Sequence, residues 1–203
     1  MSYPKMPPSK EQIAELELFA GLEMEQITVV RTASVAEQAF EELKRSGQVG
    51  FDTESKPTFY KGEKSEGPHV LQFATLERAF VFQSHVAETM PVVMALLESE
   101  KIHKIGFGLR GDLSHISMRF GIRASAIVDL DMSFRKLGYR NAVGAKSAIA
   151  IFFQQRMVKS KSITTSNWSN PVLTERQLVY AANDAYAAIQ VHHALKKSGV
   201  SEV

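Results

Sequence analysis

Aspartate is the scarcer acidic residue of this chain, and its positions are where metal or acid–base chemistry is expected. Of the 22 acidic residues, five are Asp and 17 are Glu, so Glu carries the ordinary surface charge and each Asp calls for a local reason. Asp52 and Glu54 end an apolar run that is typical of a buried strand. Because side chains on a strand alternate between its faces, these two share one face, where like charges favour a bound cation or a shared proton. An ordinary strand-end turn is the alternative.

Two later segments supply further candidates. Asp112 follows a short apolar run, 104–107, at a predicted helix start, where a favourable helix-dipole charge is the simpler interpretation. Tyr180 and Asp184 lie four residues apart on the last predicted helix, and therefore on one face of it; a packed tyrosine beside an exposed Asp is the alternative. Together, carboxylate oxygens without Cys or paired His favour Mg²⁺ or Mn²⁺, which is typical of two-metal phosphodiester hydrolysis.

The composition limits the other possible chemistries. The chain has 203 residues and no Cys, which excludes cysteine-ligated zinc, iron–sulfur clusters, thiol nucleophiles and disulfides. Hydrophobic residues make up 44% and charged residues 23%, which excludes a disordered or collagen-like chain. Because no apolar run reaches the length of a membrane span and the N-terminal sequence has no signal-peptide core, we expect a soluble, cytoplasmic protein.

The small net charge of +2 is unevenly distributed. Residues 101–170 carry twelve Lys and Arg against three Asp, a local net charge of +9, so the remainder carries −7. This asymmetry indicates a polyanionic partner, with a solvated basic face as the plainer interpretation. Phosphate contacts and base stacking are expected from residues of the polar loop after Glu54 and from the basic segment, namely Lys56, Phe59, Tyr60, Lys61, Lys146 and Lys161.

The predicted elements describe one α/β domain, a mixed sheet flanked by helices on both faces. Strands are expected at 27–31, 49–52, 70–74, 79–83, 104–107 and 127–129. Helices are expected at 34–45, 89–99, from 111 onward, and at 174–197, where Thr174 and Gln177 form a capping box, with several short helices over 131–153. Residues 1–25 form an arm with a short helix at about 10–19, and 26–203 form the functional domain. Trp168 is expected in the core and His192 at the surface.

In their order, the motifs resemble the DEDD superfamily of 3′→5′ exonucleases, in the subgroup with tyrosine in the third motif. Werner-type exonuclease domains are the nearer likeness and ribonuclease D the more distant one. The resemblance runs from about residue 27 to 195 and includes all five functional positions. The matching stretches are Val49-Gly-Phe-Asp-Thr-Glu54, Val70-Leu-Gln-Phe73, Gly106-Phe-Gly-Leu-Arg-Gly-Asp112, Lys161-Ser-Ile-Thr-Thr-Ser-Asn-Trp168 and Tyr180-Ala-Ala-Asn-Asp184.

The resemblance implies a ribonuclease H-like sheet of five or six strands and a metal-dependent 3′→5′ exonuclease that releases nucleoside 5′-monophosphates. It implies that Asp52, Glu54 and Asp184 hold one of two Mg²⁺ or Mn²⁺ ions. It also implies that Asp52 bridges to the second ion, that Asp112 supports it through water, and that Tyr180 orients or deprotonates the attacking water. The expected partner is nucleic acid with a free 3′ end, DNA favoured over RNA, with no membrane and no obligate protein partner.

Two other functions compete with this interpretation. One is a non-catalytic nucleic-acid-binding module with a vestigial metal site, and the complete set of five residues argues against it. The other is a metal-dependent phosphatase or nucleotidase that acts on small molecules, which the basic segment and the polar loop disfavour.

Overall fold

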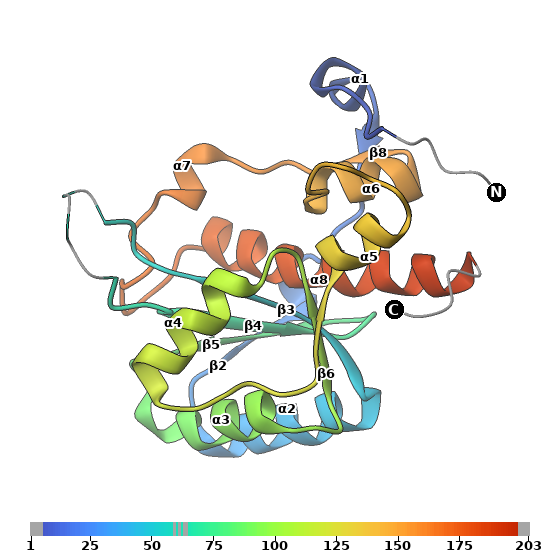
Figure 1. Ribbon diagram of the computed structural model, residues 1–203. Helices are drawn as coiled ribbons and strands as arrows, with labels where there is room; N and C mark the ends of the chain where they lie inside the picture. The colour runs from blue at the N-terminus through green and yellow to red at the C-terminus, as the bar shows by residue number, and fades with distance from the viewer. Residues whose placement is uncertain (1–5, 59, 61, 63–64, 199–203) are drawn as a thin grey trace.

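A six-stranded mixed sheet runs through the middle of the molecule (Figure 1). The computed structural model describes residues 6–58, 60, 62 and 65–198. β4 is antiparallel to both of its neighbours and the remaining pairs are parallel, which confirms the predicted mixed sheet. In spatial order the strands are β2 (Ile27–Val30), β5 (Ala79–Gln83), β4 (Val70–Ala74), β3 (Gln48–Glu54), β6 (His103–Gly106) and β7 (Ile127–Asp129).

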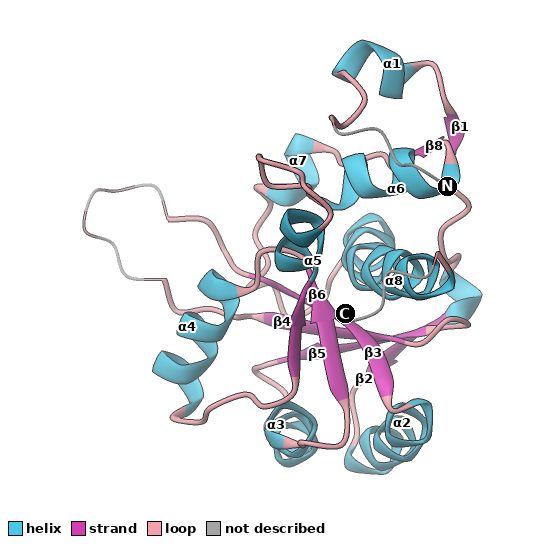
Figure 2. Cartoon of the chain, turned by 45° about the vertical axis from the view of Figure 1, so that its right-hand side comes forward, coloured by secondary structure: helices cyan, strands magenta, loops and turns pink. Residues whose placement is uncertain are grey.

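Helices cover both faces of this sheet, as predicted (Figure 2). The lower face in Figure 1 packs on α2 (Ala33–Ser46), α3 (Met90–Glu98) and α4 (Arg110–Phe120). The opposite face packs on α5 (Leu130–Lys136), α6 (Ala145–Phe153) and α8 (Glu175–Lys197). Short elements complete the chain: α7 (Lys161–Thr164) and the 3₁₀ turns η1 (Met24–Gln26) and η2 (Ala87–Thr89).

The alternation of side chains along the strands divides the core into two layers. Phe51, Phe73 and Phe82 point toward α2 and α3. The ring centre of Phe73 lies 5.1 Å from that of Phe51 and 5.8 Å from that of Phe82. Val70 and Val81 point toward α8 instead. This period of two is the pattern that the sequence shows, and it decides which residues of β3 meet α8.

α8 approaches the sheet closely because small residues face it. Ala181, Ala182, Ala185 and Ala188 are all buried on this helix. A Cβ atom added to Gly50 on β3 would lie 1.8 Å from the carbonyl oxygen of Ala185, so only glycine fits beneath the helix. The helix begins with the predicted capping box, in which the side chain of Thr174 accepts a hydrogen bond from the backbone of Gln177.

Two predictions about single residues have opposite outcomes. Trp168 is fully buried, as expected, and its Nε1 donates to the carbonyl oxygen of Thr164 over 3.2 Å. The surface position expected for His192 is wrong, because this residue is 1% exposed. His192 lies two helical turns after Asp184, on the same face of α8, and that face packs on the sheet. Burial lowers the pKa of His192 to about 4.

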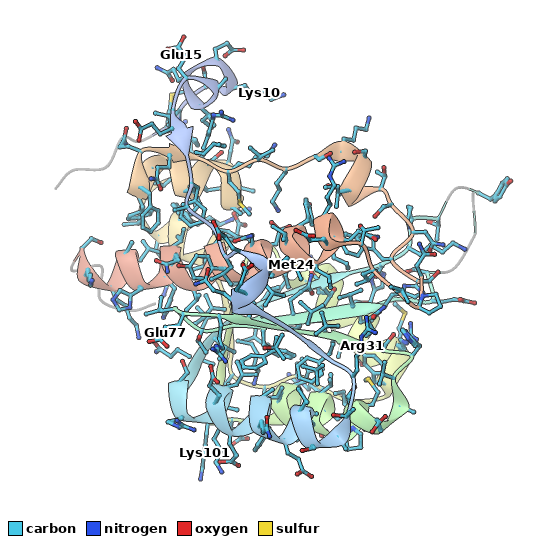
Figure 3. All side chains as sticks on the ribbon, turned by 180° about the vertical axis from the view of Figure 1, so that it is seen from behind. Lys10, Glu15, Met24, Arg31, Glu77 and Lys101 are labelled. Carbon is cyan, nitrogen blue, oxygen red and sulfur yellow. The ribbon has the colours of Figure 1, made fainter. Side chains whose placement is uncertain are left out.

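The N-terminal arm is less helical than predicted. α1 (Lys10–Ala14) ends early, and β1 (Glu17–Leu18) pairs in parallel with β8 (Gln155–Arg156). The backbone hydrogen bonds of this distant pairing replace those that would continue the helix, so tertiary contact overrides the local pattern. In Figure 3 the labelled Lys10 and Glu15 mark α1 at the far end of the arm, and Met24 marks where the arm passes α8 toward the sheet.

Among the residues that the structure describes, no helix is both long and apolar enough to cross a membrane.

The contact of α8 with β3 predicts that Gly50→Ala is strongly destabilising. The added methyl group meets backbone, which cannot rotate away, so we expect the free energy of unfolding to fall by about 1–3 kcal/mol or more, as for other overpacked cores. Gly144→Ala is the control, because a Cβ atom there has open space within 4 Å and the loss expected at this N-cap of α6 is smaller, about 1 kcal/mol or less. Urea denaturation of both variants checks this; equal stability would mean that α8 can shift away from β3 at no cost.

Candidate active site

The end of β3 presents two carboxylates to α8. Asp52 and Glu54 lie on the sheet face that α8 covers, and Thr53 between them points to the other face. One carboxylate oxygen from each of Asp52, Glu54 and Asp184 lies within 4.8 Å of the other two. The end of β3 and the middle of α8 thus bring these three acids close together.

Asp184 is the most deeply buried of the three acids. Its side chain is 3% exposed, and its Oδ2 accepts a hydrogen bond of 2.8 Å from the Lys159 ammonium group. Its second oxygen, Oδ1, is buried and accepts no hydrogen bond from the residues that the structure describes. Lys159 lies between β8 and α7, and its Nζ is also 5.7 Å from the centre of the Tyr180 ring. Asp has a poor helix propensity, and the ion pair with Lys159 explains why one is found buried in the middle of α8.

Asp112 contacts β3 at Thr53, the residue between Asp52 and Glu54. It is in the first turn of α4, and its Oδ1 accepts a short hydrogen bond from the Thr53 hydroxyl group. Asp129 fixes the turn that leads into α4, because its carboxylate accepts hydrogen bonds from the backbone N–H groups of Gly108 (2.9 Å) and Leu109 (3.0 Å). Asp112 is thus linked to the acid-bearing end of β3 through Thr53, and its charge adds to the raised pKa values of Asp52 and Glu54.

Tyr180 borders the cluster one helical turn before Asp184. Its hydroxyl group is 2.9 Å from that of Thr164 at the end of α7. Its ring packs 5.9 Å from that of Trp168, which anchors this segment in the core. Burial, followed by the charge of Asp184, raises the pKa of Tyr180 to about 12, so its hydroxyl group stays protonated at neutral pH.

The electrostatics of the cluster favour a bound cation. Burial raises the pKa of Glu54 to about 9, and the charges of Asp52 and Asp184 add to this effect. Burial also raises the pKa of Asp52 well above its usual value, with Asp184 as the next cause. The pKa of Asp112 is raised by burial, against the hydrogen bond from Thr53. Such groups keep protons in the folded state unless positive charge is brought to them.

A divalent metal ion fits the residues present. The cluster offers only carboxylate oxygens, which suit Mg²⁺ and Mn²⁺. The buried Oδ1 of Asp184, which has no hydrogen-bond partner in the described part of the chain, is one available ligand atom. Gln72 lies directly opposite Asp52 in the β3–β4 pairing, is fully buried, and has neither amide atom hydrogen-bonded within the described chain. Unpaired buried polar groups are costly, and a hydrated ion beside them would supply partners.

The residues predicted to contact substrate have different positions. Lys56 and Tyr60 are exposed on the loop that follows β3, and Tyr60 is 82% exposed. Phe59 and Lys61 lie outside the residues that the structure describes. Lys146 is exposed on α6 and donates to the carbonyl oxygen of Lys159 over 3.4 Å, which places it near the cluster. Lys161 is exposed at the start of α7.

Sequence reasoning missed four neighbours of the cluster, Lys159, Thr164, Thr53 and Gln72. Lys159 was one of several lysines in a basic segment, and nothing in its spacing distinguished it from Lys161. Thr53 could have been found, because it stands between two candidate acids and must face the opposite side of the strand. Gln72 could also have been found, as the one polar residue within the apolar run 70–74.

A mixed sheet covered by helices, with an acidic cluster between its central strand and its last helix, is a ribonuclease H-like fold. The exonuclease domain of Nibbler from Aedes aegypti superposes with a TM-score of 0.73 at 21% identity, over 89% of this chain and 92% of that one. Escherichia coli RNase D superposes with a TM-score of 0.71 at 19% identity, over 85% of this chain and 46% of that one.

The chain belongs to the 3′-5′ exonuclease family, whose model matches residues 27–199. It is 31% identical over 153 residues to the mouse bifunctional 3′-5′ exonuclease/ATP-dependent helicase WRN, which covers 74% of this chain and 11% of that protein. It is 28% identical over 153 residues to a 3′-5′ exonuclease of Arabidopsis thaliana, over 73% of this chain and 52% of that protein. The chain thus spans about half, or less, of the length of these relatives.

The raised pKa values predict how stability depends on pH without metal. The folded protein holds protons that the unfolded chain releases, so the free energy of unfolding should fall as pH rises from about 4.5 to about 9, the usual and the folded pKa of Glu54. Asp52→Asn removes one repelling charge. At pH 8 in EDTA we therefore expect a higher melting temperature than in the parent, by about 2–4 °C for each kcal/mol of relieved repulsion.

Calorimetry in EDTA and in Mn²⁺ checks this prediction. The advantage of the variant should shrink toward pH 4.5 and should reverse in Mn²⁺, because the variant lacks a ligand. A parent whose melting temperature rises with pH in EDTA would contradict the described electrostatics.

Proposed function

We propose that this chain is a metal-dependent 3′→5′ exonuclease of the tyrosine-containing DEDD subgroup, which releases nucleoside 5′-monophosphates from a free 3′ end. The observation that carries the proposal is the acidic cluster, in which oxygens of Asp52, Glu54 and Asp184 lie within 4.8 Å of one another beside Tyr180. Membership of the exonuclease family supports the direction of the reaction. The proposed catalytic domain is 26–203, with 1–25 as an arm.

The proposed cofactors are two divalent ions, Mg²⁺ or Mn²⁺. Asp52, Glu54 and Asp184 would hold the first, Asp52 would be shared with the second, and Asp112 would complete the set through water. Bound there, such ions would supply Lewis acidity at the scissile phosphate and at the departing 3′ oxygen. The raised carboxyl pKa values support this assignment, because the cluster repels itself without positive charge.

Tyr180 is proposed to orient the attacking water and not to deprotonate it. In the metal-free site burial raises the pKa of Tyr180 to about 12, so the phenol is protonated at neutral pH, which supports an orienting role. Its O–H group can donate to, or accept from, a neighbouring water. The hydrogen bond with Thr164 and the packing against Trp168 hold the ring in one orientation, which is the preorganisation that such a role requires.

DNA is the proposed preferred polymer, on the strength of the likeness to the WRN exonuclease. RNA is the competing polymer, because a Trypanosoma brucei RNase D of similar fold was solved in complex with RNA U12. The lysines at 56, 61, 146 and 161 are proposed to contact the backbone. Contacts of this kind would make binding weaken with salt, with a slope of about −0.7 for each phosphate contact on a single strand.

Digestion of end-labelled oligomers tests the proposal. A 5′-labelled DNA strand should give a ladder that shortens one nucleotide at a time in Mn²⁺, a 3′-labelled strand should give mononucleotide at once, and EDTA should stop both reactions. The same pair of RNA strands measures polymer preference. Binding without any cleavage in Mn²⁺ would instead indicate a non-catalytic module, and cleavage of mononucleotides alone would indicate a phosphatase.

For the Tyr180→Phe variant we expect slower cleavage with unchanged binding of the oligomer. The ring and its packing remain, and only the hydroxyl group that handles the water is removed, so single-turnover cleavage should fall by about 10²–10⁴-fold. Tyr186→Phe is the matched control, since it is a half-buried tyrosine on the same helix. Oligomer affinity in Ca²⁺ should be within a few-fold of the parent for both. Parental turnover in Tyr180→Phe would reduce this tyrosine to a packing role.

A further inference from the structure

Residues 16–22 of the arm, here called the strap, are bound to both segments that border the acidic cluster. At β8, the backbone N–H group of Phe19 donates to the carbonyl oxygen of Arg156 over 3.0 Å, and Arg156 Nε donates to that of Leu16 over 2.8 Å. At α8, the backbone N–H of Leu22 donates to Asn183 Oδ1 over 2.7 Å, and Asn183 Nδ2 donates to the carbonyl oxygen of Leu22 over 3.0 Å.

These contacts lie one to three residues from the cluster. Asn183 directly precedes Asp184 on α8. The residue that is hydrogen-bonded to the strap and the residue that lies beside Asp52 therefore belong to the same helical turn. Arg156 is followed three residues later by Lys159, whose ammonium group pairs with Asp184. The strap therefore joins the helix that carries Asp184 and Tyr180 to the segment that carries Lys159 and Thr164.

The backbone of the strap packs closely against the side chain of Asn183. A Cβ atom added to Gly21 would lie 2.3 Å from Asn183 Oδ1 and 2.7 Å from its Cγ. Phe19 adds apolar contact, with its ring centre 5.7 Å from that of Phe153 and 6.1 Å from that of Tyr186. Two reciprocal hydrogen bonds and a close glycine contact make this a specific joint, in which a change on either side disturbs the other.

Next to this joint the packing is open. A cavity of about 620 Å³ lies between the strap, the segment after β8, and α8, and its wall includes Val158, Ile163, Tyr180 and Asn183. The segment between β8 and α7 therefore does not rest fully on α8 along this side. Lys159 ties the middle of this segment to Asp184, and the strap holds the start of the segment at Arg156.

We propose that the strap is a positioning element of the exonuclease site, with Asn183 and Gly21 as its joint. The proposal rests on the proposed function. It adds a role for residues that precede the segment matched by the family model, which begins at residue 27. Through Asn183 the strap sets the position of Asp184, and through β8 it sets that of Lys159.

A double-mutant cycle tests this joint. Asn183→Ala removes both hydrogen bonds, and Gly21→Ala forces the joint apart from the other side. Each should lower the single-turnover rate by about tenfold and raise the Mn²⁺ midpoint by several-fold, at the low end of the effect of groups that support metal ligands. The double variant should be no worse than Asn183→Ala, because the atoms that the new methyl group would meet are then absent. Gly144→Ala should match the parent.

The Mn²⁺ midpoint is measured independently of activity, from the quenching of tryptophan fluorescence. Trp168 is the one tryptophan of the chain, and its ring centre lies 5.9 Å from that of Tyr180. Measurements are made well below the melting temperature of each variant. Lower melting temperatures with parental rates and midpoints would overturn the proposal, since the strap would then be structural only. A parent that binds Mn²⁺ but cleaves no nucleic acid would overturn the proposed function. The Mn²⁺ midpoints of the variants would still show whether the strap positions the metal ligands.

Discussion

The close contact of α8 with β3 determines how Asp52, Glu54 and Asp184 lie relative to one another. Gly50 lets the helix backbone descend onto the strand, and two residues further along β3 the same approach brings Asp52 against Asp184. The packing of the apolar residues around this contact must then offset the repulsion of three acids, because bringing like charges together in a partly buried place is unfavourable. At this contact the apolar packing stabilises the fold, and the repulsion between the carboxylates destabilises it.

Lys159 is the internal counter-charge that partly resolves this opposition. Although burial alone would lower the pKa of its ammonium group, the carboxylates of Asp184 and Asp52 outweigh it and raise that pKa, so the positive charge is permanent. A hydrogen-bonded pair of this kind is weak evidence for added stability, since desolvation offsets much of the attraction. A divalent cation bound at Oδ1 of Asp184 would share that carboxylate with Lys159, which bonds Oδ2.

Periodicity predicted the parts of the site that lie within one element. The alternation of β3 put Asp52 and Glu54 on one face, and the four-residue spacing on α8 put Tyr180 beside Asp184. Contacts between distant segments left no local signal. The strap pairs with residues about 140 positions away, the hydrogen bond of Asp112 to Thr53 crosses between elements, and the choice of Lys159 among several lysines depends on where α7 is held.

The most direct test of the account is an anomalous diffraction measurement on crystals soaked in Mn²⁺. We expect a manganese peak between the carboxylates of Asp52, Glu54 and Asp184. The matched crystal of Asp52→Asn should show the peak weakened or lost. A parent crystal with no manganese among these three acids would contradict the assignment of the cluster as a metal site.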